Sequence, residues 1–149
     1  MNIPRPALAL GLAGLLPFGW GVATLLIPAL HDLTLATLGP RFTGPYVLIA
    51  YGSVILSFMS GVLWGFAARR AEDRFSGYAL SVLPALWVFF MVGGGPSQAL
   101  SALLVGYLAL LRIDWQFAVW DLAPGWWMRL RLILTAGVVL ALALGLWLG

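Results

Sequence analysis

The sequence predicts an all-α integral membrane protein, a single domain over residues 1–149 built as a bundle of five transmembrane helices with short loops. Of its 149 residues, 62% are hydrophobic and 9% are charged, and the mean hydropathy is +1.01. An average soluble domain has about 25% charged residues. So few polar side chains cannot cover a soluble core, which excludes a soluble enzyme, a disordered chain and a nucleic-acid-binding domain. The apolar segments long enough to be spans are residues 6–30, 46–68, 76–92, 97–112 and 130–148.

The first span, residues 6–30, is too long for a simple signal peptide, so we expect a retained helix. Pro17 lies in its middle and predicts a kink, because proline has no amide hydrogen to donate. Residues 31–45 follow, with two Gly-Pro pairs that are typical of a loop. Within this loop we expect a short interfacial turn at residues 33–38.

The second span, residues 46–68, ends where the chain becomes strongly charged. Such a cluster cannot lie in lipid, so it marks the end of the helix. Two of its members, Arg69 and Asp73, are four residues apart and are expected to pair on the helix end. The cluster consists of Arg69, Arg70, Glu72, Asp73 and Arg74.

The third and fourth spans are short and are joined by an uncharged turn at residues 93–96. Ser76 is a suitable N-cap for the third span, which contains Pro84. Ser97 can cap the fourth span in the same way. Two short helices with a tight turn between them predict an antiparallel helical hairpin.

The connection from residue 112 to residue 131 is rich in tryptophan and arginine and precedes the last span. Indole rings prefer the headgroup level of a bilayer, and arginines there reach lipid phosphates. The same composition is also typical of docking surfaces between proteins. Asp114 and Asp121 in this segment are expected to pair with neighbouring arginines at the interface. The residues of this predicted interfacial belt or docking surface are Trp115, Trp120, Trp126, Trp127, Arg129 and Arg131.

The basic residues predict the orientation of the chain. All eight are Arg. With five spans, seven of them fall on the side of the N-terminus and only Arg41 falls on the other side. Short loops rich in arginine stay inside. We therefore expect an integral protein of the inner (cytoplasmic) membrane, with a cytoplasmic N-terminus and a periplasmic C-terminus.

Small residues recur every four positions along the second span. At this spacing they line one face of a helix and allow another helix to approach closely. The favoured interpretation is helix packing inside the bundle; the alternative is a ligand groove lined by hydroxyl groups. The residues of this helix-packing or ligand-groove prediction are Tyr51, Ser53, Ser57, Gly61, Trp64 and Gly65. A weaker pattern of the same kind, Gly137, Ala141 and Gly145, lies in the fifth span.

The sequence offers little for catalysis. Cysteine is absent and His31 is the only histidine, so no metal site or cofactor is predicted. His31 and Asp32 are interpreted as a solvated loop pair. Apart from Arg112 and Arg131 at the ends of their spans, no ionisable residue is expected inside an apolar span, which disfavours an ion-coupled pump. We expect no enzymatic activity.

Several segments carry a family resemblance. Residues 51–58 read Tyr-Gly-Ser-Val-Ile-Leu-Ser-Phe and are followed by Gly61, Trp64 and Gly65. This run resembles a conserved segment of the DUF3429 family, which includes the mitochondrial transmembrane protein 69. Residues 60–63 depart from the family pattern, in which a Gly-Gly pair and a polar or basic residue are more frequent before the tryptophan. Further similar segments are residues 11–18, 81–87, 124–126 and 130–135.

The resemblance implies a small multi-span membrane protein of the bacterial or mitochondrial inner membrane and no known activity. The leading hypothesis is a non-catalytic accessory, assembly or stabilising partner of a larger membrane complex. The alternative is a binder or carrier of a small hydrophobic ligand, such as a quinone, a lipid or a tetrapyrrole, in a cleft between helices bounded by Tyr51, Ser57 and Trp64. The expected partners are the lipid bilayer and another integral membrane protein, and no nucleic acid.

Overall fold

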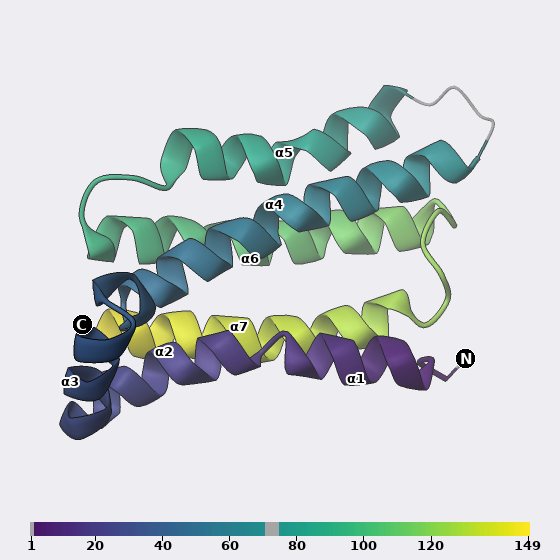
Figure 1. Ribbon diagram of the computed structural model, residues 1–149. Coiled ribbons are helices and arrows are strands. Elements are labelled where there is room, and N and C mark those ends of the chain that lie inside the picture. The colour runs from purple at the N-terminus through teal and green to yellow at the C-terminus, as the bar shows by residue number, and fades with distance from the viewer. Residues whose placement is uncertain (1, 71–74) are drawn as a thin grey trace.

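The computed structural model describes residues 2–70 and 75–149, and within these ranges the chain is helical with no strand. The all-α prediction is therefore confirmed. Figure 1 shows the helices running along one another as an elongated bundle. The helices are α1 (Arg5–Ala13), α2 (Leu16–Leu26), α3 (Pro28–Thr37), the 3-10 turn η1 (Pro40–Phe42), α4 (Tyr46–Arg69), α5 (Phe75–Met91), α6 (Pro96–Val119) and α7 (Trp127–Leu148).

Among the described residues, four helical segments are long and apolar enough to cross a membrane: α1 with α2 (Arg5–Leu26), α4, α6 and α7. The fifth predicted span corresponds to α5, which has 17 residues. At a rise of about 1.5 Å per residue it is roughly 25 Å long, less than the ~30 Å hydrocarbon core of a bilayer. The structure thus supports a membrane bundle with four candidate spans and one shorter apolar helix.

The bundle has two distinct ends. The N-terminus, the end of α4, the start of α5, the end of α6 and the start of α7 lie at one of them (Figure 1). The C-terminus lies at the other, together with α3 and the turn between α5 and α6. Along the bundle, α4 contacts α2, α5 and α6, and α7 contacts α2 and α6.

The first helix breaks where Pro17 predicts it. α1 ends at Ala13 and α2 begins at Leu16, so the break lies one turn before the proline. Because Pro17 has no amide hydrogen, it leaves the carbonyl of Ala13 without its helical partner. The break at Gly14 and Leu15 sits beside the cavity described below.

The predicted loop at residues 31–45 is mostly helical, which corrects the expectation of a short turn there. Ile27 is extended, as expected of a residue before proline, and Pro28 then starts α3. Thr34 donates a hydrogen bond to the carbonyl oxygen of Leu30, one turn earlier. The Gly-Pro pairs indicated a loop, but the ten residues after Pro28 contain no helix breaker.

α6 also continues beyond its predicted end, from residue 112 to Val119. The tryptophan-rich connection is correspondingly shortened to residues 120–126. A hydropathy average ends the span at Arg112, whereas the inward-facing positions continue the helical repeat through Tyr107, Leu110, Asp114 and Phe117, all fully buried.

Side chains of one helix donate hydrogen bonds to backbone carbonyl oxygens of a neighbouring helix. The indole nitrogen of Trp87 on α5 donates to the carbonyl oxygen of Ala102 on α6 at 2.7 Å. The hydroxyl of Tyr107 on α6 donates to the carbonyl oxygen of Gly52 on α4, also at 2.7 Å. Buried polar groups in lipid need such internal partners.

Ser60 on α4 compensates for the proline inside α5. The backbone N–H of Ala85, next to Pro84, donates to the hydroxyl oxygen of Ser60 at 2.8 Å. Ser60 is buried at the contact between α4 and α5. The hydroxyl therefore accepts a hydrogen bond from the backbone at the point where α5 contains its proline.

We expect Ser60→Ala to lower the free energy of unfolding by about 1–3 kcal/mol, because the Ala85 N–H loses its acceptor in an apolar surrounding. In a Pro84→Ala background, α5 can form its own hydrogen bonds, and the same substitution should cost less. Unfolding of the four variants in mixed detergent micelles measures the difference. Equal costs in both backgrounds would show that Ser60 does not compensate for Pro84.

Candidate functional site

One face of α7 carries the most polar cluster inside the bundle. Trp127, Arg131, Thr135 and Val138 follow one another at helical spacing and are all buried. Asp114 of α6 faces them. Its carboxylate accepts from the Arg131 Nε at 2.8 Å through Oδ2 and from the Trp127 indole nitrogen at 2.9 Å through Oδ1.

This ion pair is buried inside the bundle. Asp114 is 0% exposed and Arg131 is 4% exposed. The sequence predicted that Asp114 pairs with an arginine at the membrane interface; the pairing exists, but it is internal. The expectation that no charge lies inside a span is therefore wrong. It failed because a hydropathy window counts an acid and a base as two polar residues, whereas packing turns them toward each other. The helical repeat through Asp114 was the available signal.

A cavity of about 250 Å³ lies beside the ion pair. Its inner part is formed by buried side chains, among them Tyr107, Arg131 and Thr135. Its rim includes Leu10 and Phe58, which are 75% and 63% exposed. The cavity thus runs from the outer surface of the bundle to the buried arginine. The remaining lining is apolar or glycine: Gly11, Gly14, Leu15, Phe18, Ile55, Met59, Leu134 and Val138.

Two residues that line this cavity each carry a buried polar atom without a partner. Within the described part of the chain, the Arg131 Nη2 and the Thr135 Oγ1 are buried and make no hydrogen bond. Thr135 is 3% exposed. A buried donor without an acceptor costs about 1–3 kcal/mol. Since both residues line the cavity, an acceptor group bound there is one way to satisfy these atoms.

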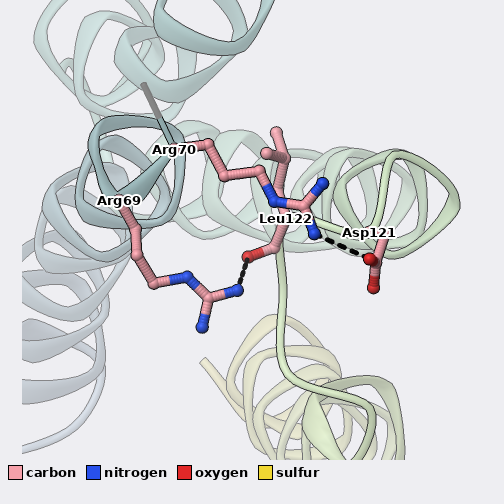
Figure 2. Close-up of polar contacts among 4 residues, drawn as sticks. All are labelled: Arg69, Arg70, Asp121 and Leu122. Carbon is pink, nitrogen blue, oxygen red and sulfur yellow. Dashed lines mark hydrogen bonds and ion pairs between the residues drawn. The ribbon is translucent and has the colours of Figure 1, made fainter. Parts of the chain in front are cut away.

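The charged end of the bundle is held by two arginines at the end of α4 (Figure 2). Arg70 forms an ion pair with Asp121 at 2.7 Å, and Arg69 donates to the carbonyl oxygen of Leu122 at 3.3 Å. These contacts fix the connection before α7 against α4. Asp121 thus pairs with Arg70 instead of Arg112, Arg129 or Arg131. Asp73, the predicted partner of Arg69, lies outside the described residues.

Only some of the small residues in the predicted stripe on α4 face another helix. Ser53 and Ser57 are half-buried. A Cβ added to Gly61 or Gly65 would meet no atom of another described residue within 4 Å. At these two glycines the favoured interpretation, packing within the bundle, is not observed. On α7, by contrast, Gly145 closely approaches Leu48.

The two aromatic residues of the same prediction lie apart. The ring of Tyr51 packs edge-on against Phe18 with centroids 5.2 Å apart, near the break between α1 and α2. The ring of Trp64 packs against Tyr78 of α5 at 4.7 Å. The structure therefore does not bring Tyr51, Ser57 and Trp64 around one cleft.

The predicted tryptophan belt divides into inward and outward residues. Trp115 is exposed, and Arg112 lies over its ring at 4.7 Å. Trp127 points inward to Asp114. Arg131 is also turned inward, so it does not reach lipid phosphates as predicted. Of the other belt residues, Arg129 is exposed, and Trp120 and Trp126 are half-buried.

Metal ligands are not grouped in the described ranges: no three His, Cys, Asp or Glu side chains come together within residues 2–70 and 75–149. His31 and Asp32 both lie in α3, at the end of the bundle away from the ion pair. What the site offers is a donor-lined, otherwise apolar cavity for a molecule with a hydrogen-bond acceptor.

Comparisons with known proteins place the chain among membrane proteins. It is 34% identical to transmembrane protein 69 of Xenopus tropicalis over 146 residues, which is 95% of this chain and 53% of that protein. It is 26% identical to transmembrane protein 69 of Mus musculus over 140 residues, 91% of this chain and 53% of that protein. The chain thus spans about half the length of these relatives, and no solved structure matches it significantly. A family model described as "Protein of unknown function (DUF3429)" matches residues 3–147. The resemblance found in the motifs is confirmed, and the chain belongs to the DUF3429 family.

Proposed function

We propose that this protein is a non-catalytic membrane protein that binds a small, mostly apolar molecule in the cavity beside Arg131. The supporting observation is the pair of unsatisfied buried polar atoms, Arg131 Nη2 and Thr135 Oγ1, on residues that line an otherwise apolar cavity. Small-molecule sites commonly combine apolar walls with a few fixed polar groups. The proposal takes up the ligand-binding alternative of the sequence analysis at a different place, because Tyr51, Ser57 and Trp64 do not form one cleft.

A cavity-filling variant tests this function. Val138→Phe places a larger side chain into the cavity lining, and overpacking of about 1–3 kcal/mol corresponds to a roughly five-fold or greater loss of affinity for a molecule bound there. Protein purified from its native membrane is extracted with organic solvent, and the bound molecules are identified by mass spectrometry. We expect a molecule that accompanies the wild type and is depleted in Val138→Phe.

The matched control is Leu140→Phe, which makes a similar change on the outward face of α7, where Leu140 is 62% exposed. It should retain the molecule. Size-exclusion profiles and helix content show whether both variants remain folded. If every extracted molecule is present in equal amount in Val138→Phe and Leu140→Phe, the cavity is not a binding site.

An accessory role in a larger membrane complex is the second candidate, and the outward glycines of α4 favour it. Gly61 lies in a shallow groove beside α5 that is lined also by Ser60, Trp64 and Val82. A Cβ at Gly65, one turn further along α4, also meets no atom of another described residue within 4 Å. A helix of another integral membrane protein fits such a surface, because small residues allow close approach. In this candidate function, Gly61→Leu removes a co-purifying membrane protein in mild detergent, whereas Val54→Leu on the exposed surface leaves it bound.

We also propose an inner-membrane location with the N-terminus in the cytoplasm. The support is the arginine distribution. Arg5 begins α1, Arg69 and Arg70 end α4, and Arg129 lies in the first turn of α7. These helix ends lie together at the end of the bundle that holds the N-terminus (Figure 1). α5 then has to cross the membrane despite its length, which a locally thinner bilayer allows.

Cysteine labelling checks this orientation, because the chain has no cysteine of its own. A single cysteine at Gly125, in the connection before α7, should stay unlabelled by a membrane-impermeant maleimide in intact cells and react after lysis. A cysteine at Gly39, at the other end, should be labelled in intact cells. The reverse pattern would contradict the orientation.

A further inference from the structure

We infer that the cavity selects an uncharged molecule with a carbonyl group, which enters from the surrounding lipid with the carbonyl leading. This inference rests on the proposed ligand-binding function and specifies the chemical class of the ligand. It is carried by the charge balance around Arg131, by the kind of polar atoms left open, and by the shape of the cavity.

The charge balance excludes an anion as the preferred ligand. The Arg131 guanidinium already binds the Asp114 carboxylate at 2.8 Å, and both groups are buried. A phosphate or carboxylate beside them would add a second negative charge to one guanidinium in an apolar surrounding. Burying a charge without its own counter-charge is costly. A neutral ligand avoids this cost and leaves the ion pair intact.

The open polar atoms define the complementary group. Arg131 Nη2 is a donor only, and the Thr135 hydroxyl can donate as well. Arg131 and Thr135 are four residues apart on α7, so they lie on the same face one turn from each other. Tyr107, which also lines the cavity, already donates its proton to Gly52. A carbonyl oxygen brings two lone pairs and no hydrogen of its own, so it complements two groups that can both donate.

The shape of the cavity indicates how such a molecule enters. Leu10 and Phe58 at the rim belong to the outer surface of α1 and α4, while Thr135 and Arg131 lie inside. In a bilayer this outer surface faces the acyl chains. A polar head on an apolar tail therefore reaches the donors from the side, and its tail remains among the lipids. About 250 Å³ suffices for a ring-sized head but not for a long tail.

Three probes with the same ring and chain test the inference: 4-decylacetophenone, which is a neutral ketone, 4-decylbenzoate, which is an anion, and decylbenzene, which has no acceptor. Binding is measured by calorimetry with the full chain in phosphatidylcholine nanodiscs, after subtraction of empty nanodiscs. We expect the ketone to bind about five-fold tighter than decylbenzene for each hydrogen bond gained. The benzoate should bind more weakly than the ketone.

Thr135→Val keeps the shape of the side chain and removes the hydroxyl. It should weaken ketone binding about five-fold and leave decylbenzene binding unchanged. Thr135→Ser retains a hydroxyl and should retain most of the ketone affinity. Equal ketone binding in Thr135→Val and the wild type would overturn the role of the hydroxyl.

Two outcomes separate this inference from the proposed function. If 4-decylbenzoate binds as tightly as the ketone or tighter, the ligand is an anion; the carbonyl inference fails and the binding function stands. If none of the three probes binds above empty nanodiscs and Val138→Phe retains every extracted molecule, the cavity holds only water and both fail.

Discussion

Asp114→Ala is expected to lower the free energy of unfolding by about 3–5 kcal/mol, one of the largest losses from a single substitution in this chain. The substitution leaves the Arg131 guanidinium inside the bundle without a counter-charge and removes the acceptor of the Trp127 indole. Titration with sodium dodecyl sulfate in mixed micelles, followed by circular dichroism, measures the change.

The double variant Asp114→Ala/Arg131→Met is the decisive control. It removes both charges and fills part of the space, and replacing a buried ion pair by apolar residues is often neutral or stabilising. We therefore expect the double variant to be more stable than Asp114→Ala alone. If the two variants unfold at the same detergent fraction, the stability lost in Asp114→Ala comes from the space that the shorter side chain leaves and not from the uncompensated charge of Arg131.

Gly44→Ala is expected to lower the free energy of unfolding by about 3 kcal/mol, the upper end of what overpacking usually costs. A Cβ at this position would stand against the carbonyl oxygen of Gly21 on α2, and also 2.9 Å from the Leu25 side chain. The Gly44 N–H donates to the Thr24 hydroxyl at 2.8 Å, which holds the start of α4 against α2. The backbone of α2 cannot yield locally, so the two helices must separate.

Gly19→Ala supplies the comparison for Gly44→Ala. Gly19 lies in α2, the helix that Gly44 contacts, but a Cβ there meets nothing within 4 Å among the described residues. Alanine is a better helix former than glycine by about 1 kcal/mol, so this variant should be as stable as the wild type or more stable. If Gly19→Ala lowers the stability as much as Gly44→Ala does, the close approach of Gly44 to the backbone of α2 is not the reason for the loss.

The membrane class, the helical fold and the family were predictable because they depend on composition and on local motifs. The segment 46–68 was also recognisable, since an unbroken apolar run and a following charge cluster mark its ends, and α4 covers Tyr46–Arg69. These signals act within a few residues of the position they determine. The bend near Pro17 belongs to the same group, because a missing amide hydrogen acts on its own helix.

The candidate site could not be predicted in the same way, because it depends on which residues of α6 and α7 face each other. Asp114 and Arg131 are 17 positions apart, and each alone looks like an interfacial residue. The small residues of α4 show a second reason why the site was hard to predict. Its spacing predicts a common face for Gly61 and Gly65, but spacing does not say whether that face points inward or outward. The cavity depends on the break between α1 and α2 as well as on packing, and no motif encodes it.

The ion pair between α6 and α7 also bears on how the chain enters the membrane. Each helix, inserted alone, would carry an unpaired charge, which costs about 2.5–3.5 kcal/mol at the middle of a helix on translocon-derived scales and less near its end. Only residues 120–126 separate the two helices, so they can leave the translocon as one hairpin. In that hairpin the carboxylate and the guanidinium are neutralised together. We therefore expect α6 and α7 to enter the membrane together, with the acid of one helix neutralised by the base of the other.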